Sequence, residues 1–268
     1  CTLINGCTTA RFMVQQKPTI NIAQATGMAT LPTLYSLTTD ELSHYCLSLV
    51  DDIIVIDPRL MPAVLGEIGL PIVTRRDNTK TGLDLFAPLE GVYEDASINL
   101  HNIQLVDGLF FEVILNINTF NTDIINTPIE SKRPTINIGS NQYTIKHSPG
   151  AAFLSLIEHA DIDDFNLLGF VSAQEAEKRR GVFAVGGISQ TKIPNIMIHG
   201  LNSDPLIWRH LTMAILNEPS LIEKHQVWHV YYPSGPPHFY NAARTRANLL
   251  SVVEALGNPE LTKEAVIV

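Results

Sequence analysis

The segment from residue 193 to residue 268 alternates between short apolar runs and longer runs with helical spacing. The apolar runs are rich in Ile, Val, Trp and Tyr and have the length of strands, whereas the intervening runs repeat apolar residues every three or four positions. Strands that alternate with helices over short connections predict a parallel sheet covered by helices, because parallel neighbours need a crossover of this kind. We expect strands at 193–198, 226–232 and 265–268, with a helix in each of the two gaps.

Turn-forming residues set the boundaries of these elements. Asp204-Pro205 supplies a helix cap followed by a proline at a permitted first-turn position. Pro233-Ser234-Gly235 ends the second strand. Gly257-Asn258-Pro259 ends the helix that lies between the second and third strands. These signals place the segment in the α/β class.

The first strand runs directly into His199-Gly200-Leu201-Asn202. A strand that ends in His-Gly, at the start of such an alternating order, resembles the α/β-hydrolase family, in which this motif closes the third strand. The resemblance implies that the backbone amide of Leu201, or alternatively of Asn202, belongs to an oxyanion hole for acyl transfer. It also implies that Gly200 lets the backbone approach substrate closely and that His199 braces the loop rather than acting as the base.

Three more residues are candidate substrate contacts. Tyr232 and Ser234 follow a strand at its carboxyl end, where α/β folds bind ligands. Trp208 lies after the His-Gly loop, where an aromatic side chain either lines an acyl pocket or packs in the core. Ser203 and Ser234 are interpreted as ordinary loop serines and not as nucleophiles.

The nucleophile that the resemblance implies is missing. None of the 268 residues forms a Gly-x-Ser-x-Gly sequence, which in this family follows the fifth strand. That strand begins here at Ala265, so we expect the elbow directly after Val268, with the acid and the base further on. We therefore interpret the chain as the N-terminal portion of a serine esterase or lipase-like hydrolase, inactive as given.

The residues before 193 predict helices and antiparallel strands in place of an alternating order of strands and helices. A capping pattern at Thr38 and Glu41 predicts a helix over 39–50, and a second helix is expected over 62–68. Short β-rich runs from 83 to 146 predict antiparallel strands, and 151–160 predicts a helix. The predicted organisation is an arm (1–35), a helical and antiparallel β module (36–150), and the first half of an α/β-hydrolase domain (151–268).

The N-terminus resembles a lipid-anchoring sequence. Leu3-Ile4-Asn5-Gly6-Cys7 resembles the lipobox of bacterial lipoproteins, and Cys1 is an alternative acylated residue. More loosely, the order of the whole chain resembles lipoprotein hydrolases of Gram-negative bacteria. The resemblance implies a protein anchored to a membrane of the bacterial cell envelope, facing the periplasm or the surface, and acting on an ester or lipid substrate. The alternative is a non-catalytic envelope lipoprotein that uses the fold for binding or scaffolding.

Composition excludes other classes. A net charge of −9 argues against a nucleic-acid partner, and the short basic cluster Lys178-Arg179-Arg180 is interpreted as solvated surface. The three cysteines lack metal-ligand spacing, so no metal is expected, and no organic cofactor is implied.

Overall fold

The computed structural model describes residues 13–15, 46–76, 92–105, 108–117, 135–138, 140–159, 177, 180–186, 189–257 and 260–268. The chain forms two compact units, each described here by itself. Unit 1 comprises Cys1–Asp77, Glu90–Thr119 and Lys132–Glu158, and unit 2 comprises Asn78–Leu89, Phe120–Ser131 and His159–Val268. Among the described residues, no helix is both long enough and apolar enough to cross a membrane.

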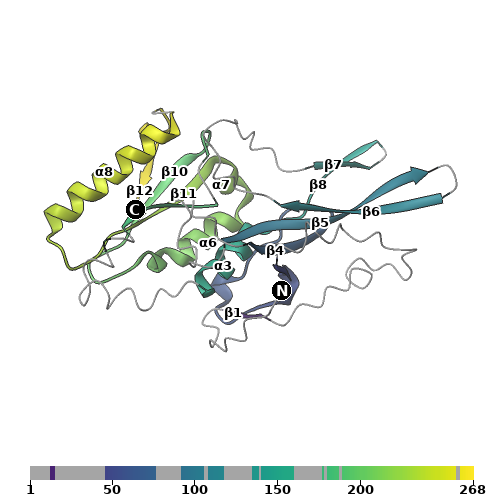
Figure 1. The fold of residues 1–268 in the computed structure, drawn as a ribbon, viewed down its shortest axis with the longest axis horizontal. Coiled ribbons are helices and arrows are strands. Elements are labelled where there is room, and N and C mark those ends of the chain that lie inside the picture. Colours follow the sequence, from purple (N-terminus) through teal and green to yellow (C-terminus); the bar gives the residue numbers. More distant parts are fainter. Residues whose placement is uncertain are drawn as a thin grey trace. The chain divides into compact units, whose positions relative to one another are not determined.

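Unit 1 is built on a four-stranded antiparallel sheet in the order β2-β4-β5-β6. In β5 and β6 the pairing runs from Ala96 opposite Ile117 to Leu105 opposite Gly108, and the two strands form the long ribbon in Figure 1. Two shorter antiparallel pairs join β1 to β3 and β7 to β8. The strands are β1 (Met13–Gln15), β2 (Cys46–Leu49), β3 (Ile53–Val55), β4 (Leu70–Arg76), β5 (Val92–Leu105), β6 (Gly108–Ile117), β7 (Thr135–Ile138) and β8 (Asn141–Thr144).

One helix, α3 (Pro149–His159), completes unit 1. The sequence predicts a helix here, over 151–160, but assigns it to the C-terminal domain. The start of α3 is fixed by side chains distant in sequence. The buried Asp95 carboxylate accepts a hydrogen bond from the Ser148 amide at 2.7 Å, and the Ser148 hydroxyl donates to the Ala63 carbonyl at 2.8 Å. A carboxylate at this position satisfies an amide that the helix leaves without a partner and interacts favourably with the helix dipole.

The helix predicted over 39–50 is wrong for its last residues. Cys46–Leu49 forms β2, which pairs with β4 and is followed by a 3-10 turn, η1 (Val50–Asp52); residues 39–45 lie outside the described residues. Pairing with buried positions of β4, such as Ile72 and Val73, outweighs the local helical spacing.

The helix predicted over 62–68 is also wrong. The only regular helical turn near it is a 3-10 helix, η2 (Pro58–Leu60), and Leu65 and Ile68 instead form isolated bridges to His147 and Ile145. Gly66 has φ +100°, and a Cβ there would lie 2.4 Å from the Ile145 carbonyl oxygen. The glycine therefore allows a close backbone crossing that a right-handed helix cannot make.

Unit 2 contains a mixed four-stranded sheet in the order β12-β10-β11-β9. β10 (Ile193–Ile198) pairs in parallel with β11 (His225–Tyr231) on one side and with β12 (Val266–Ile267) on the other. β9 (Gly181–Val185) is antiparallel to β11. The predicted strands at 193–198, 226–232 and 265–268 are thus confirmed within one or two residues, and so is their parallel pairing.

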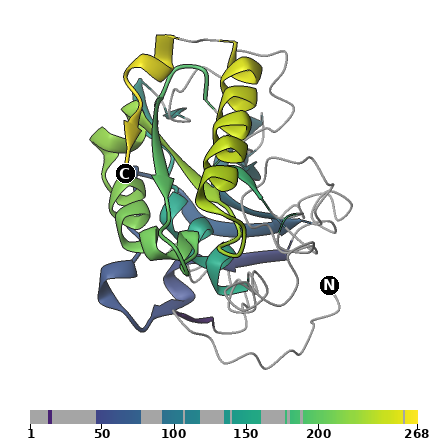
Figure 2. The ribbon, with the colours of Figure 1, turned by 90° about the vertical axis from the view of Figure 1, so that its left-hand side faces the viewer.

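Helices cover both faces of this sheet. The connection from β10 to β11 contains η3 (Pro205–Trp208), α6 (Arg209–Asn217) and α7 (Pro219–Lys224), and that from β11 to β12 contains α8 (His238–Leu256) and α9 (Glu260–Lys263). Met197 and Val227 pack with Ile215 of α6, whereas Ile196 and Trp228 pack with Val252 of α8. Neighbouring residues of a strand face opposite sides, so α6 and α8 lie on opposite faces (Figure 2). The class is α/β.

The predicted helix boundaries in unit 2 are also confirmed. Asp204 caps η3 through a 2.7 Å hydrogen bond from the Leu206 amide to its carboxylate, with Pro205 at the first helical position. At the other end, α8 stops at Gly257, whose φ of 66° is left-handed.

The two faces of α8 give a matched stability test. Val252 is 8% exposed and contacts the sheet core, whereas Leu250 is 55% exposed on the same helix. We expect Val252→Ala to lower the free energy of unfolding of unit 2 by about 2 kcal/mol, through lost burial plus a cavity. Leu250→Ala should change it by less than about 0.5 kcal/mol. Urea denaturation followed by fluorescence reports this unit, because both tryptophans, Trp208 and Trp228, belong to it. Equal losses would mean that α8 packs through another face.

Candidate functional site

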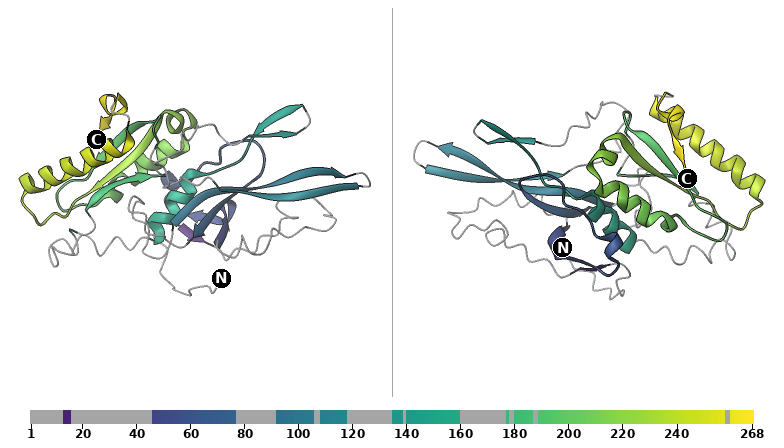
Figure 3. Two further views of the ribbon diagram at one scale, coloured as in Figure 1. Left: turned by 45° about the horizontal axis from the view of Figure 1, so that its top comes forward. Right: turned by 180° about the vertical axis from the view of Figure 1, so that it is seen from behind.

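The candidate site lies at the carboxyl ends of β10 and β11. The two strands are parallel neighbours, with Ile198 opposite Val230, so both end at the same rim of the sheet. The loop after β10 (199–204, the β10 loop) leads to α6 on one face, and the loop after β11 (232–237, the β11 loop) leads to α8 on the other. Loops that diverge in this way open a crevice between two strands, which is where open α/β sheets bind ligands. Figure 3 shows the two parallel strands with helices on either side.

His199 joins the two loops. It is 2% exposed; its Nε2 accepts a 3.2 Å hydrogen bond from the Tyr232 amide, and its Nδ1 lies 2.9 Å from the Gly200 carbonyl oxygen. Because Nε2 accepts, the proton of the neutral ring is on Nδ1 and is donated to Gly200. Both ring nitrogens are therefore occupied within the loops, as the bracing role predicted for His199 requires.

Tyr232 makes the reciprocal contact. Its hydroxyl donates to the His199 carbonyl oxygen at 2.7 Å, and its ring stacks on the imidazole with centroids 4.3 Å apart and planes 11° apart. Burial raises the pKa of the Tyr232 hydroxyl, so it remains a donor at neutral pH. The predicted substrate contact Tyr232 thus lies directly beside the His-Gly motif.

Two buried histidines of this region stay neutral. Burial lowers the pKa of His199, an effect that its hydrogen bond to Gly200 partly opposes. Burial also lowers the pKa of His229 in β11 to about 3, against an opposing hydrogen bond to the Pro205 carbonyl. His229 Nε2 lies 2.8 Å from the Thr212 hydroxyl of α6, so this second histidine braces the helix against the sheet.

The two amides predicted as oxyanion donors differ. Asn202 has φ 56°, a left-handed conformation that asparagine tolerates, and its amide donates to the Ser234 hydroxyl oxygen at 2.9 Å. The Leu201 amide has no hydrogen-bond acceptor among the residues that the structure describes. Of the two, the Leu201 amide is therefore the one available to a ligand. The Asn202 amide is held by Ser234.

Gly200 lies beside open space. Its φ is not left-handed, and an added Cβ would meet no described atom within 4 Å. Neither backbone strain nor packing in the described part of the chain therefore requires a glycine here. The missing side chain instead leaves the backbone of the β10 loop open to close approach from outside.

Trp208, predicted either to line an acyl pocket or to pack in the core, contacts the core. It ends η3 and packs against the cluster of Met197, Ile215 and Val227 on the α6 face of the sheet. These contacts are those of core packing, and its buried Nε1 has no hydrogen-bond partner among the described residues.

Sequence reasoning missed Arg180 and Asn241. Arg180 was interpreted as solvated surface, which is wrong: its side chain is 2% exposed and forms a bidentate ion pair with Glu177 at 2.8 and 2.9 Å. Asn241 of α8 is 5% exposed and donates to the Pro233 and Pro236 carbonyls of the β11 loop. A charge that directly precedes a strand carries no local sign of burial, so only the packing of α8 against β9 reveals it.

Ser203 and Ser234 are engaged in hydrogen bonds of the loops themselves. The Ser203 hydroxyl donates to the Asp204 carbonyl at 3.4 Å, and the Ser234 oxygen accepts from Asn202. In unit 1, Ser148 lies beside His147 and close to Asp95, the residue types of a catalytic triad. There the serine proton goes to a backbone carbonyl and the side chain is fully buried, so attack on a substrate is excluded.

Comparison of the chain with protein-family models, curated proteins and solved structures finds no match. Within the described ranges, no cluster of three or more His, Cys, Asp or Glu side chains is arranged to hold a metal ion. The predicted lipidation residues Cys1 and Cys7 lie outside the described residues.

The two neutral histidines predict a pH dependence. A folded pKa below the unfolded value of about 6.5 means that the unfolded state binds more protons. The contribution of the neutral histidine to the free energy of unfolding is therefore fully present above about pH 6.5 and is lost as the pH falls toward about 3. At pH 5 we expect His229 alone to lower the free energy of unfolding by about 2 kcal/mol relative to pH 7.

Urea titrations of unit 2 at pH 7 and pH 5, read by tryptophan fluorescence, measure this loss. His229→Gln should flatten the dependence, whereas His238→Gln should leave it unchanged because the His238 side chain is exposed. The buried His199 should leave a residual dependence in the His229 variant, whereas a dependence as large as in the unchanged protein would assign it to other groups.

Proposed function

We propose that unit 2 is the first half of the sheet of a serine hydrolase resembling the α/β-hydrolase family, with the Leu201 amide as one oxyanion donor. The observation that carries this proposal is the parallel pairing of β12 with β10. The Val268 amide donates to the Ile196 carbonyl at 2.9 Å and its carbonyl accepts from the Ile198 amide at 3.0 Å. These bonds place Val268 opposite Met197, two residues before the β10 loop. A nucleophile elbow directly after Val268 would emerge beside His199 and Gly200.

The proposed chemistry follows from this placement. A serine hydroxyl attacks the carbonyl carbon of an ester, and the negative charge that develops on the carbonyl oxygen needs donors fixed in advance. An amide held next to the rigid His199 and Tyr232 pair is such a donor, because it does not reorganise during the reaction. The serine, the acid and the base are all proposed to follow Val268.

Exposed apolar side chains support an acyl or lipid substrate. Leu201 in the β10 loop is 59% exposed and Ile207 in η3 is 55% exposed. Apolar side chains beside a candidate oxyanion donor suit a substrate with a hydrocarbon portion. Anchoring of the protein to a membrane of the cell envelope through Cys7 or Cys1 remains part of the proposal.

Paired substitutions at residue 201 test the donor role. In the full-length protein that contains this chain, Leu201→Pro removes the amide, whereas Leu201→Ala keeps the amide and removes only an exposed side chain. We expect the proline variant to lower kcat for a short-chain ester by about 100- to 1000-fold, the usual cost of one oxyanion donor. The alanine variant should retain kcat within a few-fold. Equal kcat in the two variants, with folding confirmed by fluorescence, would contradict the donor role.

The second candidate function is binding without catalysis, as in an envelope lipoprotein that uses the same rim to hold a ligand. It is favoured by one observation: the Ser203 and Ser234 hydroxyls, together with both nitrogens of His199, are engaged in structural hydrogen bonds. Covalent labelling of the full-length protein by a fluorophosphonate separates the two candidates, since only a hydrolase with an activated serine reacts.

A further inference from the structure

Arg180 is buried where the antiparallel strand β9 begins. Because Gly181 pairs with Tyr231, Arg180 lies level with the carboxyl end of β11 and hence with the β11 loop. Its guanidinium bonds both carboxylate oxygens of Glu177, and Nη2 also donates to the Asn241 side-chain oxygen at 2.5 Å. The ring of Tyr240 lies over the guanidinium, 5.6 Å from its central carbon.

Asn241 passes this restraint to the β11 loop. With its oxygen held by Arg180, its amide nitrogen donates to the Pro233 carbonyl at 2.9 Å and to the Pro236 carbonyl at 3.3 Å. The two bonds span Ser234 and Gly235 and clamp the turn on both sides. Because the oxygen accepts from Arg180, the amide cannot flip without losing all three bonds.

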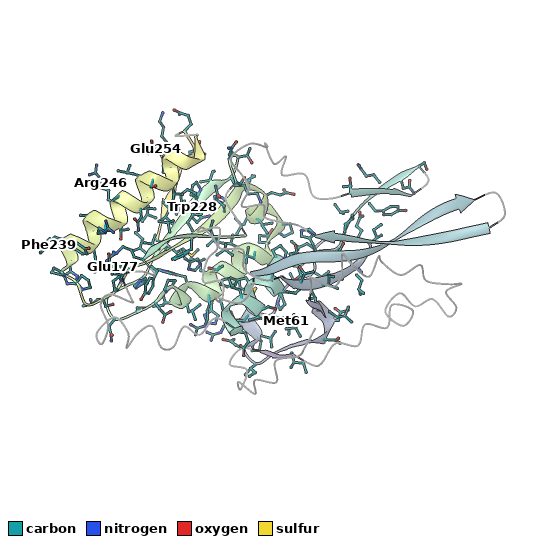
Figure 4. All side chains as sticks on the ribbon, viewed as in Figure 1. Met61, Glu177, Trp228, Phe239, Arg246 and Glu254 are labelled. Atoms are coloured by element: carbon teal, nitrogen blue, oxygen red, sulfur yellow. The ribbon has the colours of Figure 1, made fainter. Side chains whose placement is uncertain are left out.

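Ser234 is the residue inside this clamp. Its hydroxyl oxygen accepts from the Asn202 amide, so the contact between the β10 and β11 loops depends on where the turn places Ser234. A continuous series of hydrogen bonds therefore runs from Arg180 through Asn241 and the turn to Ser234 and Asn202. Figure 4 shows Glu177, which begins the series, beside the end of α8 that carries Phe239.

Stability does not account for the buried arginine. Removing a guanidinium from water is costly, and Nη1 is buried with no hydrogen-bond partner in the described part of the chain. Apolar residues often replace a buried ion pair at no loss of stability, and in some proteins such a pair instead fixes a defined geometry. Glu177 stays ionised beside it, since its hydrogen bonds from Arg180 lower its pKa.

We propose that Arg180 is a positioning residue of the candidate site, acting through Asn241 on Ser234 and so on the Asn202 amide beside the proposed donor Leu201. This inference deepens the proposed function by adding a residue to the same site. Its test reads the Asn202 amide directly and needs no turnover, so the inference and the hydrolase proposal can fail separately.

Hydrogen exchange of the Asn202 amide in the 268-residue chain tests the series. Ser234→Ala removes the acceptor and should speed exchange by up to about tenfold, the equilibrium value of one hydrogen bond. Arg180→Met and Asn241→Leu should each produce a similar increase. Arg180→Met combined with Ser234→Ala should be no faster than Ser234→Ala alone, because both act on one bond.

Arg244→Met is the matched control. Arg244 also faces Glu177, at 3.7 Å, but its side chain is 53% exposed, and its loss should leave Asn202 exchange unchanged. Unchanged exchange in a folded Arg180→Met protein, or an additive effect in the double variant, would overturn the inference. If Arg180→Met does not fold, Asn241→Leu decides in its place: unchanged Asn202 exchange in that variant would overturn the inference equally.

Discussion

The parallel pairing of β10 with two neighbours is the constraint on which the rest of unit 2 depends. β10 lies between β11 and β12, so three strand ends meet at one rim. The crossover to β11 covers one face with α6, and the crossover to β12 covers the other with α8. The β10 and β11 loops therefore lead to helices on opposite faces, which in open α/β sheets marks the place where ligands bind.

Hydrogen bonds between the β10 and β11 loops engage the polar side chains of His199, Tyr232 and Ser234. His199 and Tyr232 satisfy each other and the adjacent backbone, and the buried ring stays neutral at physiological pH. Ser234 then fixes Asn202, whereas the neighbouring Leu201 amide has no hydrogen-bond acceptor among the described residues. The side chains of His199, Tyr232 and Ser234 thus fix the two loops, and under the proposed function the Leu201 amide is the group left to bind a ligand.

The sequence predicts unit 2 well because its signals are local. Asp204, Pro205 and Gly257 mark helix ends through their own backbone preferences, and apolar runs mark the strands. Unit 1 is less predictable. Residues 46–49 become a strand through pairing with β4, and Gly66 serves a crossing with residue 145, contacts that no local pattern encodes.

Some residues of the candidate site could likewise be predicted from the sequence and others could not. His199, Gly200, Leu201, Tyr232 and Ser234 were all predicted, because strand ends in an α/β order can be read from the sequence and the rim follows from them. Arg180 and Asn241 could not be, since their role depends on the end of α8 meeting the start of an antiparallel strand. The local sequence around such residues does not predict a contact that another element provides.

Trans-hydrogen-bond couplings in isotope-labelled protein test whether β12 pairs in parallel with β10. The structure predicts that the Val268 nitrogen couples to the Ile196 carbonyl carbon and the Ile198 nitrogen to the Val268 carbonyl carbon, so Val268 bonds two different residues of β10. That is the pattern of a parallel pair, whereas an antiparallel pair returns both bonds to one residue. Couplings of Val268 to a single residue of β10, or no coupling between the two strands, would contradict the parallel pairing.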